Sequence, residues 1–164
     1  FLDPSLPEFL QQQIIKNDIA PDQVCLELTE TVLVSDIKRA TTIMQNIRDM
    51  GCMLAIDDFG TGYSSLSYLK SLPADYIKID RSFVANIASS ADDRNIVHST
   101  ISMVRNMGMQ VVAEGIETSE QYELLCHFDC NLGQGYLISR PIPEVNIWDV
   151  LSEKVEFGFW KESA

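Results

Sequence analysis

Short apolar runs alternate with longer amphipathic stretches along the chain, and this alternation restricts the fold more than any other feature of the sequence. One apolar run and the amphipathic stretch after it occupy roughly 25–30 residues, the length of one strand and its crossover helix. Strands joined by such crossovers pair in parallel. We therefore predict an α/β fold with a parallel sheet. The predicted strands cover residues 24–28, 53–56, 76–79, 110–113 and 132–137.

Capping residues and glycines mark the predicted helices. Ser35 is the predicted N-cap of a helix that stops at Gly51, and a second long helix covers residues 93–107. Thr118 and Gln121 have the spacing of a capping box and open another helix. The core faces of the two long helices are formed by Ile37, Ala40, Met44, Ile47, Ile96, Val97, Ile101 and Val104. Further helices are predicted over residues 4–17, 64–72 and 145–153.

Two architectures satisfy this alternation, an open doubly wound sheet and an eight-stranded (β/α)₈ barrel. The chain has too few strand–helix units to close such a barrel, whose usual length is about 250 residues. No linker or low-complexity segment divides the chain, so we expect residues 1–164 to belong to one domain. The residues alone leave the choice between the two architectures open.

The charge balance limits the partners of the chain. Its 24 acidic and 12 basic residues give a net charge of −12, which excludes a nucleic acid polymer as a general partner because phosphate backbones require a basic face. The apolar runs are too short to span a bilayer, and the opening residues have no signal-peptide pattern. The four cysteines fit the reduced thiols of a cytoplasmic protein, although an upstream segment could anchor the parent protein in a membrane.

Carboxylates stand at or near the C-terminal ends of four of the five predicted strands. These positions carry Glu27, Glu30, Asp57, Asp58, Asp80, Glu114 and Glu117, and they also include Lys78 and Gln134. In parallel α/β folds this end of the sheet holds the ligand. Several carboxylates in one mouth repel each other unless a cation neutralises them, and oxygen ligands favour Mg²⁺ or Mn²⁺. The pattern therefore favours metal-assisted phosphoester hydrolysis.

Some of these residues have a structural alternative. Asp80 and Glu117 could be surface partners of lysine or arginine, and Gln134 could serve only to satisfy backbone groups. Lys78 alternates inward with its strand, so a solvated lysine is not expected there. The glycine-rich loop over residues 59–65 is either a simple turn into a helix or a segment that positions the preceding aspartates.

Five motifs, in their order and at their spacing, resemble those of the EAL domain family. They are Leu-Glu-Leu-Thr-Glu at 26–30, Asp-Asp-Phe-Gly-Thr-Gly-Tyr-Ser-Ser-Leu at 57–66, Ile-Lys-Ile-Asp-Arg-Ser-Phe at 77–83, Ala-Glu-Gly-Ile-Glu-Thr at 113–118, and Gly-Gln-Gly-Tyr at 133–136 followed by Ser-Arg-Pro at 139–141. The resemblance covers nearly the whole chain. It implies a modified (β/α)₈ barrel with one antiparallel strand, and hydrolysis of cyclic di-GMP to linear pGpG with Mg²⁺ or Mn²⁺.

The resemblance also implies roles for the charged residues. Glu27 and Asp57 correspond to metal ligands, with Asp57 bridging two ions. Asp58 and Glu114 would serve the second ion or its water, and Glu114 is also a candidate general base. Lys78 would orient the nucleophilic water or stabilise phosphate charge.

Other residues are given supporting roles by the same resemblance. Gln134 would support the catalytic site, and Asp80 and Pro141 would border a guanine pocket. Glu30 resembles the glutamate that anchors the glycine-rich loop, which the family also uses in dimer contacts, and we expect Glu117 to help anchor that loop. A homodimer is therefore expected for the complete protein.

Three family features are missing from the sequence: the Glu-Ala-Leu motif, the basic residue after it, and the asparagine that completes the first metal site. All three belong on strands before Phe1. We therefore expect the chain to be the C-terminal part of an EAL domain that lacks its opening strands, preceded by a sensory or GGDEF-type domain. The alternative is a catalytically inactive EAL-like domain that binds cyclic di-GMP or a protein partner.

Overall fold

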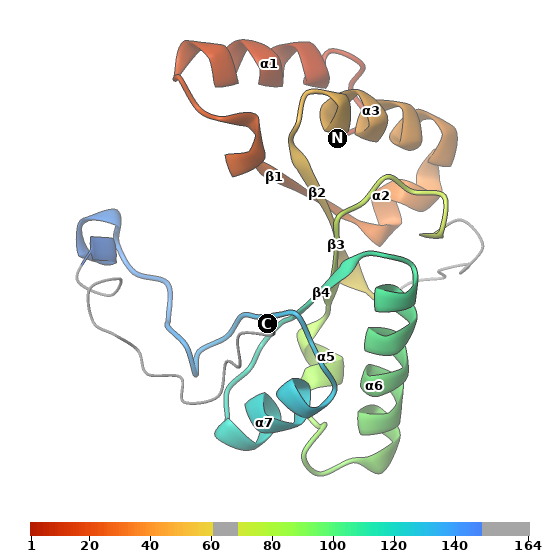
Figure 1. Ribbon diagram of the computed structural model, residues 1–164, viewed down its shortest axis with the longest axis vertical. Helices are drawn as coiled ribbons and strands as arrows, with labels where there is room; N and C mark the ends of the chain where they lie inside the picture. Colours follow the sequence, from red (N-terminus) through yellow and green to blue (C-terminus); the bar gives the residue numbers. More distant parts are fainter. Residues whose placement is uncertain (61–68, 149–164) are drawn as a thin grey trace.

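A five-stranded parallel sheet forms the centre of the protein (Figure 1), whose computed structural model describes residues 1–60 and 69–148. The strands are β1 Cys25–Thr29, β2 Met53–Phe59, β3 Tyr76–Ile79, β4 Gln110–Ala113 and β5 Leu132–Gly133. They lie in the sheet in chain order, and every neighbouring pair is parallel. A doubly wound sheet reverses its strand order at a switch point, whereas a barrel wall does not. The prediction of an α/β fold is confirmed, and the order is that of a (β/α) barrel.

Helices connect β1 to β2, β3 to β4 and β4 to β5, and several of their predicted boundaries are confirmed. The helices are α1 Leu6–Lys16, η1 Pro21–Gln23, α2 Glu30–Ser35, α3 Ile37–Asp49, α5 Arg81–Val84, α6 Ala91–Asn106, α7 Ser119–His127 and η2 Glu144–Asn146. The capping box at the start of α7 is formed as predicted, since Thr118 accepts from the backbone of Gln121 and the Gln121 side chain accepts from the backbone of Thr118. None of the helices that the structure describes combines the length and the apolar character needed to cross a membrane.

Predicted boundaries differ from the structure at the start of α3 and at the end of β5. Asp36, not Ser35, caps α3, because the Asp36 carboxylate accepts the backbone N–H of Arg39 at 3.1 Å while Ser35 ends α2. The last strand stops at Gly133, because the chain turns at Gly135, whose carbonyl accepts two backbone N–H groups further along. The predicted helix over 64–72 lies largely outside the described residues, as does most of the predicted helix over 145–153.

One face of the sheet is covered by helices, and the other is more open. The covered face carries a row of register partners that are all buried, namely Leu28, Ile56, Ile77 and Val111. The neighbouring row on the opposite face contains Glu27, Ala55, Tyr76 and Gln110. Consecutive strand residues point to opposite faces, so the apolar row faces the helices and the polar row faces the inside of the barrel wall.

Helices α3 and α6 bury their apolar stripes against the strands and lie on the right of the sheet in Figure 1. In α6 the buried residues are Val97, Ile101 and Val104, which share one side of a helix. Ile96 was predicted in this stripe but is 47% exposed, because it lies one residue, and therefore about 100° of helix rotation, away from Val97. The core face of α3 is confirmed at Ala40, Met44 and Ile47, whereas Ile37 is only half-buried.

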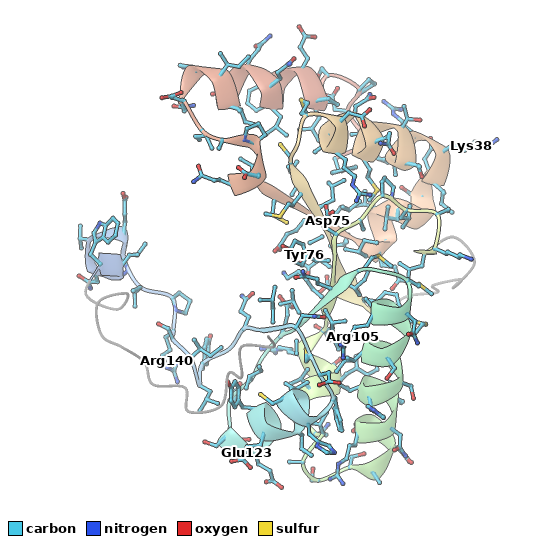
Figure 2. The ribbon with its side chains drawn as sticks, in the orientation of Figure 1. Lys38, Asp75, Tyr76, Arg105, Glu123 and Arg140 are labelled. Atoms are coloured by element: carbon cyan, nitrogen blue, oxygen red, sulfur yellow. The ribbon has the colours of Figure 1, made fainter. Side chains whose placement is uncertain are left out.

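Asp75 fixes the register at the N-terminal end of the sheet, where Figure 2 labels it beside Tyr76. Its carboxylate accepts the backbone N–H of Leu54 at 2.9 Å and forms an ion pair with Arg48 at 3.4 Å. Its backbone donates to the Leu54 carbonyl and accepts from Gln110, each at 2.9 Å. One residue thereby ties β2, β3 and β4 together, and the opposite ends of these strands are aligned with each other.

We expect Gly135→Ala to lower the free energy of unfolding by about 2–3 kcal/mol, because overpacking forces the backbone to shift. A Cβ atom at Gly135 would lie 2.1 Å from the carbonyl oxygen and 2.2 Å from the nitrogen of Ile116. Urea unfolding followed by circular dichroism measures the change. Gly108→Ala is the control, since Gly108 has a φ of +82° but nothing within 4 Å of the added atom, and it should cost only about 1 kcal/mol. Equal losses for the two variants would contradict the prediction.

Candidate metal centre

Charged side chains from four strands meet at the C-terminal end of the sheet. Glu27 lies in β1, Asp57 and Asp58 lie in β2, Lys78 lies in β3, and Glu114 follows β4 directly. The sequence placed the two aspartates just after their strand, whereas the structure extends β2 to Phe59 and includes them. The parallel register, which the bonds of Asp75 hold at the other end, brings these positions to one edge as predicted.

Lys78 is the centre of an ion-pair network. Its Nζ atom lies 2.7 Å from Glu27 Oε2, 3.1 Å from Asp57 Oδ1 and 2.7 Å from Glu114 Oε1. The lysine side chain is only 7% exposed, so water screens these contacts weakly. Burial alone would lower the pKa of Lys78, but the hydrogen bonds to Glu114, Glu27 and Asp57 outweigh burial and raise this pKa above its usual value. The ammonium therefore stays charged at neutral pH.

An irregularity in β2 lets two adjacent aspartates serve the same site. Neighbouring residues of a regular strand point to opposite faces. Here the pairing of β2 with β3 shifts register between Ile56 and Phe59, and Asp58 has a left-handed φ of +55°. The Asp57 carboxylate accepts the backbone N–H of Asp58 at 3.0 Å and stabilises this turn. A non-glycine residue held with positive φ at a strand irregularity is typical of functional sites.

The carboxylates of Asp57, Asp58 and Glu114 fit a hard divalent cation. One oxygen from each lies within 4.8 Å of the others, and all three residues are half-buried. Oxygen-only ligand sets suit Mg²⁺ and Mn²⁺. Glu27 contacts this group through Lys78 and is not one of the three that converge, and its side chain is 50% exposed.

Two glycines position Glu114 and the start of the glycine-rich loop: Gly60 belongs to the loop that the sequence analysis noted, whereas Gly115 was given no role of its own. Gly115, directly after Glu114, has a φ of +70°, and a Cβ atom there would come within 2.5 Å of Arg81 Cβ. Gly60 has a φ of +99°, and a Cβ atom there would come within 2.9 Å of Phe83 Cε2, so the missing side chain leaves room for the Phe83 ring. The signal in the sequence was a glycine directly after an acid or an apolar strand residue, but the close approach to α5 is visible only in the structure.

Glu30 lies at the base of the glycine-rich loop. Its side chain is 2% exposed, and its Oε2 atom accepts the backbone N–H of Gly60 at 3.3 Å. Its Oε1 atom is buried without a hydrogen-bond partner among the residues that the structure describes. Glu117 is exposed, and its backbone N–H donates to the Gln121 side chain at 2.8 Å. The loop-anchoring role of Glu117 stays a prediction.

The remaining predicted site residues lie around the rim. Gln134 follows β5 and is exposed, and its backbone bonds the Ala113 carbonyl at 2.9 Å and the Ile116 N–H at 3.1 Å. Asp80 caps α5 by accepting from the hydroxyl and the backbone N–H of Ser82, and these bonds hold the pKa of Asp80 below its usual value. Pro141 is exposed. Their catalytic or substrate-binding roles stay predictions.

Comparisons with known protein families and with curated proteins give consistent matches. A family model described as "EAL domain" matches residues 1–141. The chain is 39% identical over 143 residues to the bifunctional diguanylate cyclase/cyclic di-GMP phosphodiesterase MucR of Pseudomonas aeruginosa, covering 87% of this chain and 21% of that protein. It is 47% identical over 118 residues to the cyclic di-GMP phosphodiesterase NbdA of the same organism, covering 72% and 15%. The chain thus spans about a fifth or less of these relatives' length.

Solved structures agree with this comparison. The phosphodiesterase of MucR from P. aeruginosa, in complex with c-di-GMP, superposes with a TM-score of 0.84 at 38% identity, over 88% of this chain and 58% of that chain. A manganese/cy-diGMP complex of Klebsiella pneumoniae BlrP1 superposes with a TM-score of 0.79 at 37% identity, over 85% and 35%. The similarity to these solved structures confirms the predicted barrel fold, and the chain corresponds to part of a barrel domain.

We expect Asp80→Ala to lower the free energy of unfolding by about 1 kcal/mol at neutral pH, because it removes a helix N-cap. Since the pKa of Asp80 is lowered by folding, this stabilisation is present above the usual value of 3.8 and is lost as the pH falls through the folded-state pKa. Thermal melts at several pH values measure the difference. The exposed Glu123 on α7, labelled in Figure 2, supplies the control Glu123→Ala, which should change little. A loss that persists in acid would contradict the assignment of the cap.

Proposed function

The chain belongs to the EAL domain family, and from this membership we propose that it is the metal-binding part of a phosphodiesterase that hydrolyses cyclic di-GMP to linear pGpG. The observation that carries the proposal is the convergence of Asp57, Asp58 and Glu114 beside a buried Lys78. The phosphodiesterase activity named for MucR and NbdA supports it, as does the c-di-GMP complex of the MucR domain.

We assign Asp57, Asp58 and Glu114 as metal ligands, with Glu27 as a further ligand from β1. The resemblance to EAL domains gives Asp57 the role of serving two ions, and its carboxylate also contacts Lys78 at 3.1 Å. Mg²⁺ or Mn²⁺ bound here would act as a Lewis acid toward the phosphodiester and its attacking water. The manganese named in the BlrP1 complex supports this choice of ions, and the all-oxygen ligand set fits both.

The chain's own residues would handle the water and its protons. In the hydrolysis a water oxygen forms a bond to phosphorus, the bond from phosphorus to the ribose 3′ oxygen breaks, and that oxygen gains a proton. Glu114, which lies 2.7 Å from Lys78, would accept the proton that the water loses. Lys78 would hold the water in line and offset the negative charge that develops on the phosphoryl oxygens.

Rim residues would complete the site. Gln134 would support the water or its ligands from the far edge of the sheet, and Asp80 and Pro141 would border a guanine of the substrate. Glu30 would anchor the glycine-rich loop through its bond to the Gly60 backbone, and that contact supports the assignment. Glu117 would help to hold the same loop. In the complete protein this loop would also lie at a homodimer interface.

The whole protein would have further parts. The chain spans 21% of MucR, whose name includes diguanylate cyclase activity, and we propose an upstream sensory or GGDEF-type domain on this basis. We place the domain in the cytoplasm, which its four free cysteines support because reduced thiols persist there.

A domain that binds cyclic di-GMP or a protein partner without turnover is the second candidate. One observation favours it: Glu27 is half exposed and does not join the three converging carboxylates. A site with ligands for a single metal ion would hold a cation and a phosphate but would activate water inefficiently. We favour the enzyme over the binding domain because Lys78 and Glu114 are in contact with each other.

We expect the chain with Mn²⁺ to convert cyclic di-GMP to linear pGpG, and Glu114→Gln to lower the rate by about a hundredfold or more. Chromatography of timed incubations measures the product. Glu120→Gln, an exposed position in the first turn of α7, is the matched control and should keep the wild-type rate.

Two other outcomes would redirect the proposal. Equal rates for Glu114→Gln and Glu120→Gln would remove Glu114 from catalysis. Binding of cyclic di-GMP in calorimetry, without any pGpG in the same preparation, would favour the binding domain over the enzyme.

A further inference from the structure

Lys78 forms ion pairs with two of the acids that a metal ion would bind. Three carboxylates, from Glu27, Asp57 and Glu114, each place one oxygen within 3.1 Å of its Nζ atom. Two of these acids, Asp57 and Glu114, also belong to the group of three that fits a divalent cation. The ammonium and a bound cation would therefore share Asp57 and Glu114 as partners.

Charge explains why an internal cation is present. The carboxylates of Glu27, Asp57, Asp58 and Glu114 come from β1, β2 and the end of β4, and the negative charges of the half-buried Asp57, Asp58 and Glu114 repel each other at such distances. Lys78 is 7% exposed, and among the residues that the structure describes it is the cation that forms ion pairs with this cluster. The contacts of Lys78 offset part of the repulsion between these carboxylates, so the chain can fold without metal at a lower electrostatic cost.

The same contacts oppose a metal ion. A carboxylate oxygen that accepts a charge-assisted bond at 2.7 Å has one coordination position filled, and the buried positive charge repels a second cation nearby. Metal binding must loosen at least part of the network, and each bond that Lys78 gives up leaves a buried ammonium less well satisfied.

We propose that Lys78 is the internal counter-ion of the metal-free centre, and that it competes with the divalent cation for Glu27, Asp57 and Glu114, which weakens metal affinity while it stabilises the metal-free fold. This role rests on the metal centre of the proposed function and adds to it. It concerns the binding of metal and the stability of the chain, and it is separate from any contact of Lys78 with water or phosphate during turnover.

The test uses Lys78→Met, which keeps an unbranched side chain of similar length and removes the charge. We expect Mn²⁺ alone, titrated in a calorimeter without nucleotide, to bind this variant about tenfold more tightly or better. The metal-free variant should melt at a lower temperature than the wild type, and saturating Mn²⁺ should raise its melting temperature by more.

Arg48→Met is the matched control. It also removes one positive charge and one ion pair, but at the N-terminal end of the sheet, where Arg48 contacts Asp75. Its Mn²⁺ affinity should equal that of the wild type, which separates the local effect of Lys78 from a change in net charge.

A second variant covers the case in which Lys78→Met does not fold without metal. Glu27→Gln in the Lys78→Met background removes one of the carboxylates that then repel each other, so it should restore stability to that variant. In the wild-type background the same change removes a 2.7 Å ion pair and should give no gain. Destabilisation of both backgrounds by Glu27→Gln would overturn the proposal.

The outcomes also distinguish this inference from the proposed function. Equal or weaker Mn²⁺ binding by Lys78→Met, with binding by the wild type, would overturn the competition and leave the metal centre standing. Absence of Mn²⁺ binding by either protein would overturn both the competition and the metal centre.

Discussion

The register of the parallel sheet decides which side chains meet, and the rest of the site depends on it. Asp75 joins three strands at the N-terminal end through backbone and side-chain hydrogen bonds. Because partners in parallel strands point to the same face, the alignment at that end carries Asp57, Lys78 and Glu114 to the same place at the other end. A slip of one residue would send the acids to the helix-covered face, where a buried unpaired carboxylate costs several kcal/mol, roughly 3–5 by comparison with broken buried pairs.

Regular geometry alone would not assemble the centre, and local departures from it complete the site. Asp58 takes a left-handed φ of +55° within a strand, and Gly115 takes +70° immediately after Glu114. The conformation is unfavourable for Asp58, and the Asp57 carboxylate holds it by accepting the Asp58 backbone N–H. Glycine adopts positive φ readily, and at Gly115 the close approach of Arg81 leaves no room for a side chain. Rigid strands supply the direction of the side chains, and these two irregularities supply their convergence.

Much of this arrangement follows from sequence patterns, and the exceptions have physical causes. The bounds of β3 and β4 and the capping box of α7 were predicted correctly, because alternation and short-range capping are encoded locally. The alternation of strands and helices left the architecture open, because strand order depends on long-range packing, and the resemblance to the EAL family predicted the barrel that the strand order supports. The extension of β2 through Asp57 and Asp58 was missed because charged residues are depleted in strands and only the site keeps them there. Likewise Ser35 and Asp36 are both good caps, and only the break between α2 and α3 decides between them.

Electrostatics sets the order in which such a centre can work. Under the proposed function the substrate is an anion, and it approaches a cluster in which four carboxylates face a single ammonium. Lys78 reduces the negative potential of this cluster but cannot reverse its sign, so a phosphodiester would be repelled before any cation has bound. Divalent ions reverse that sign and create the attraction that the substrate needs. The same acids therefore repel phosphate in the metal-free site and, once they hold metal, create a site that attracts it. Between these two states Lys78 stabilises the fold.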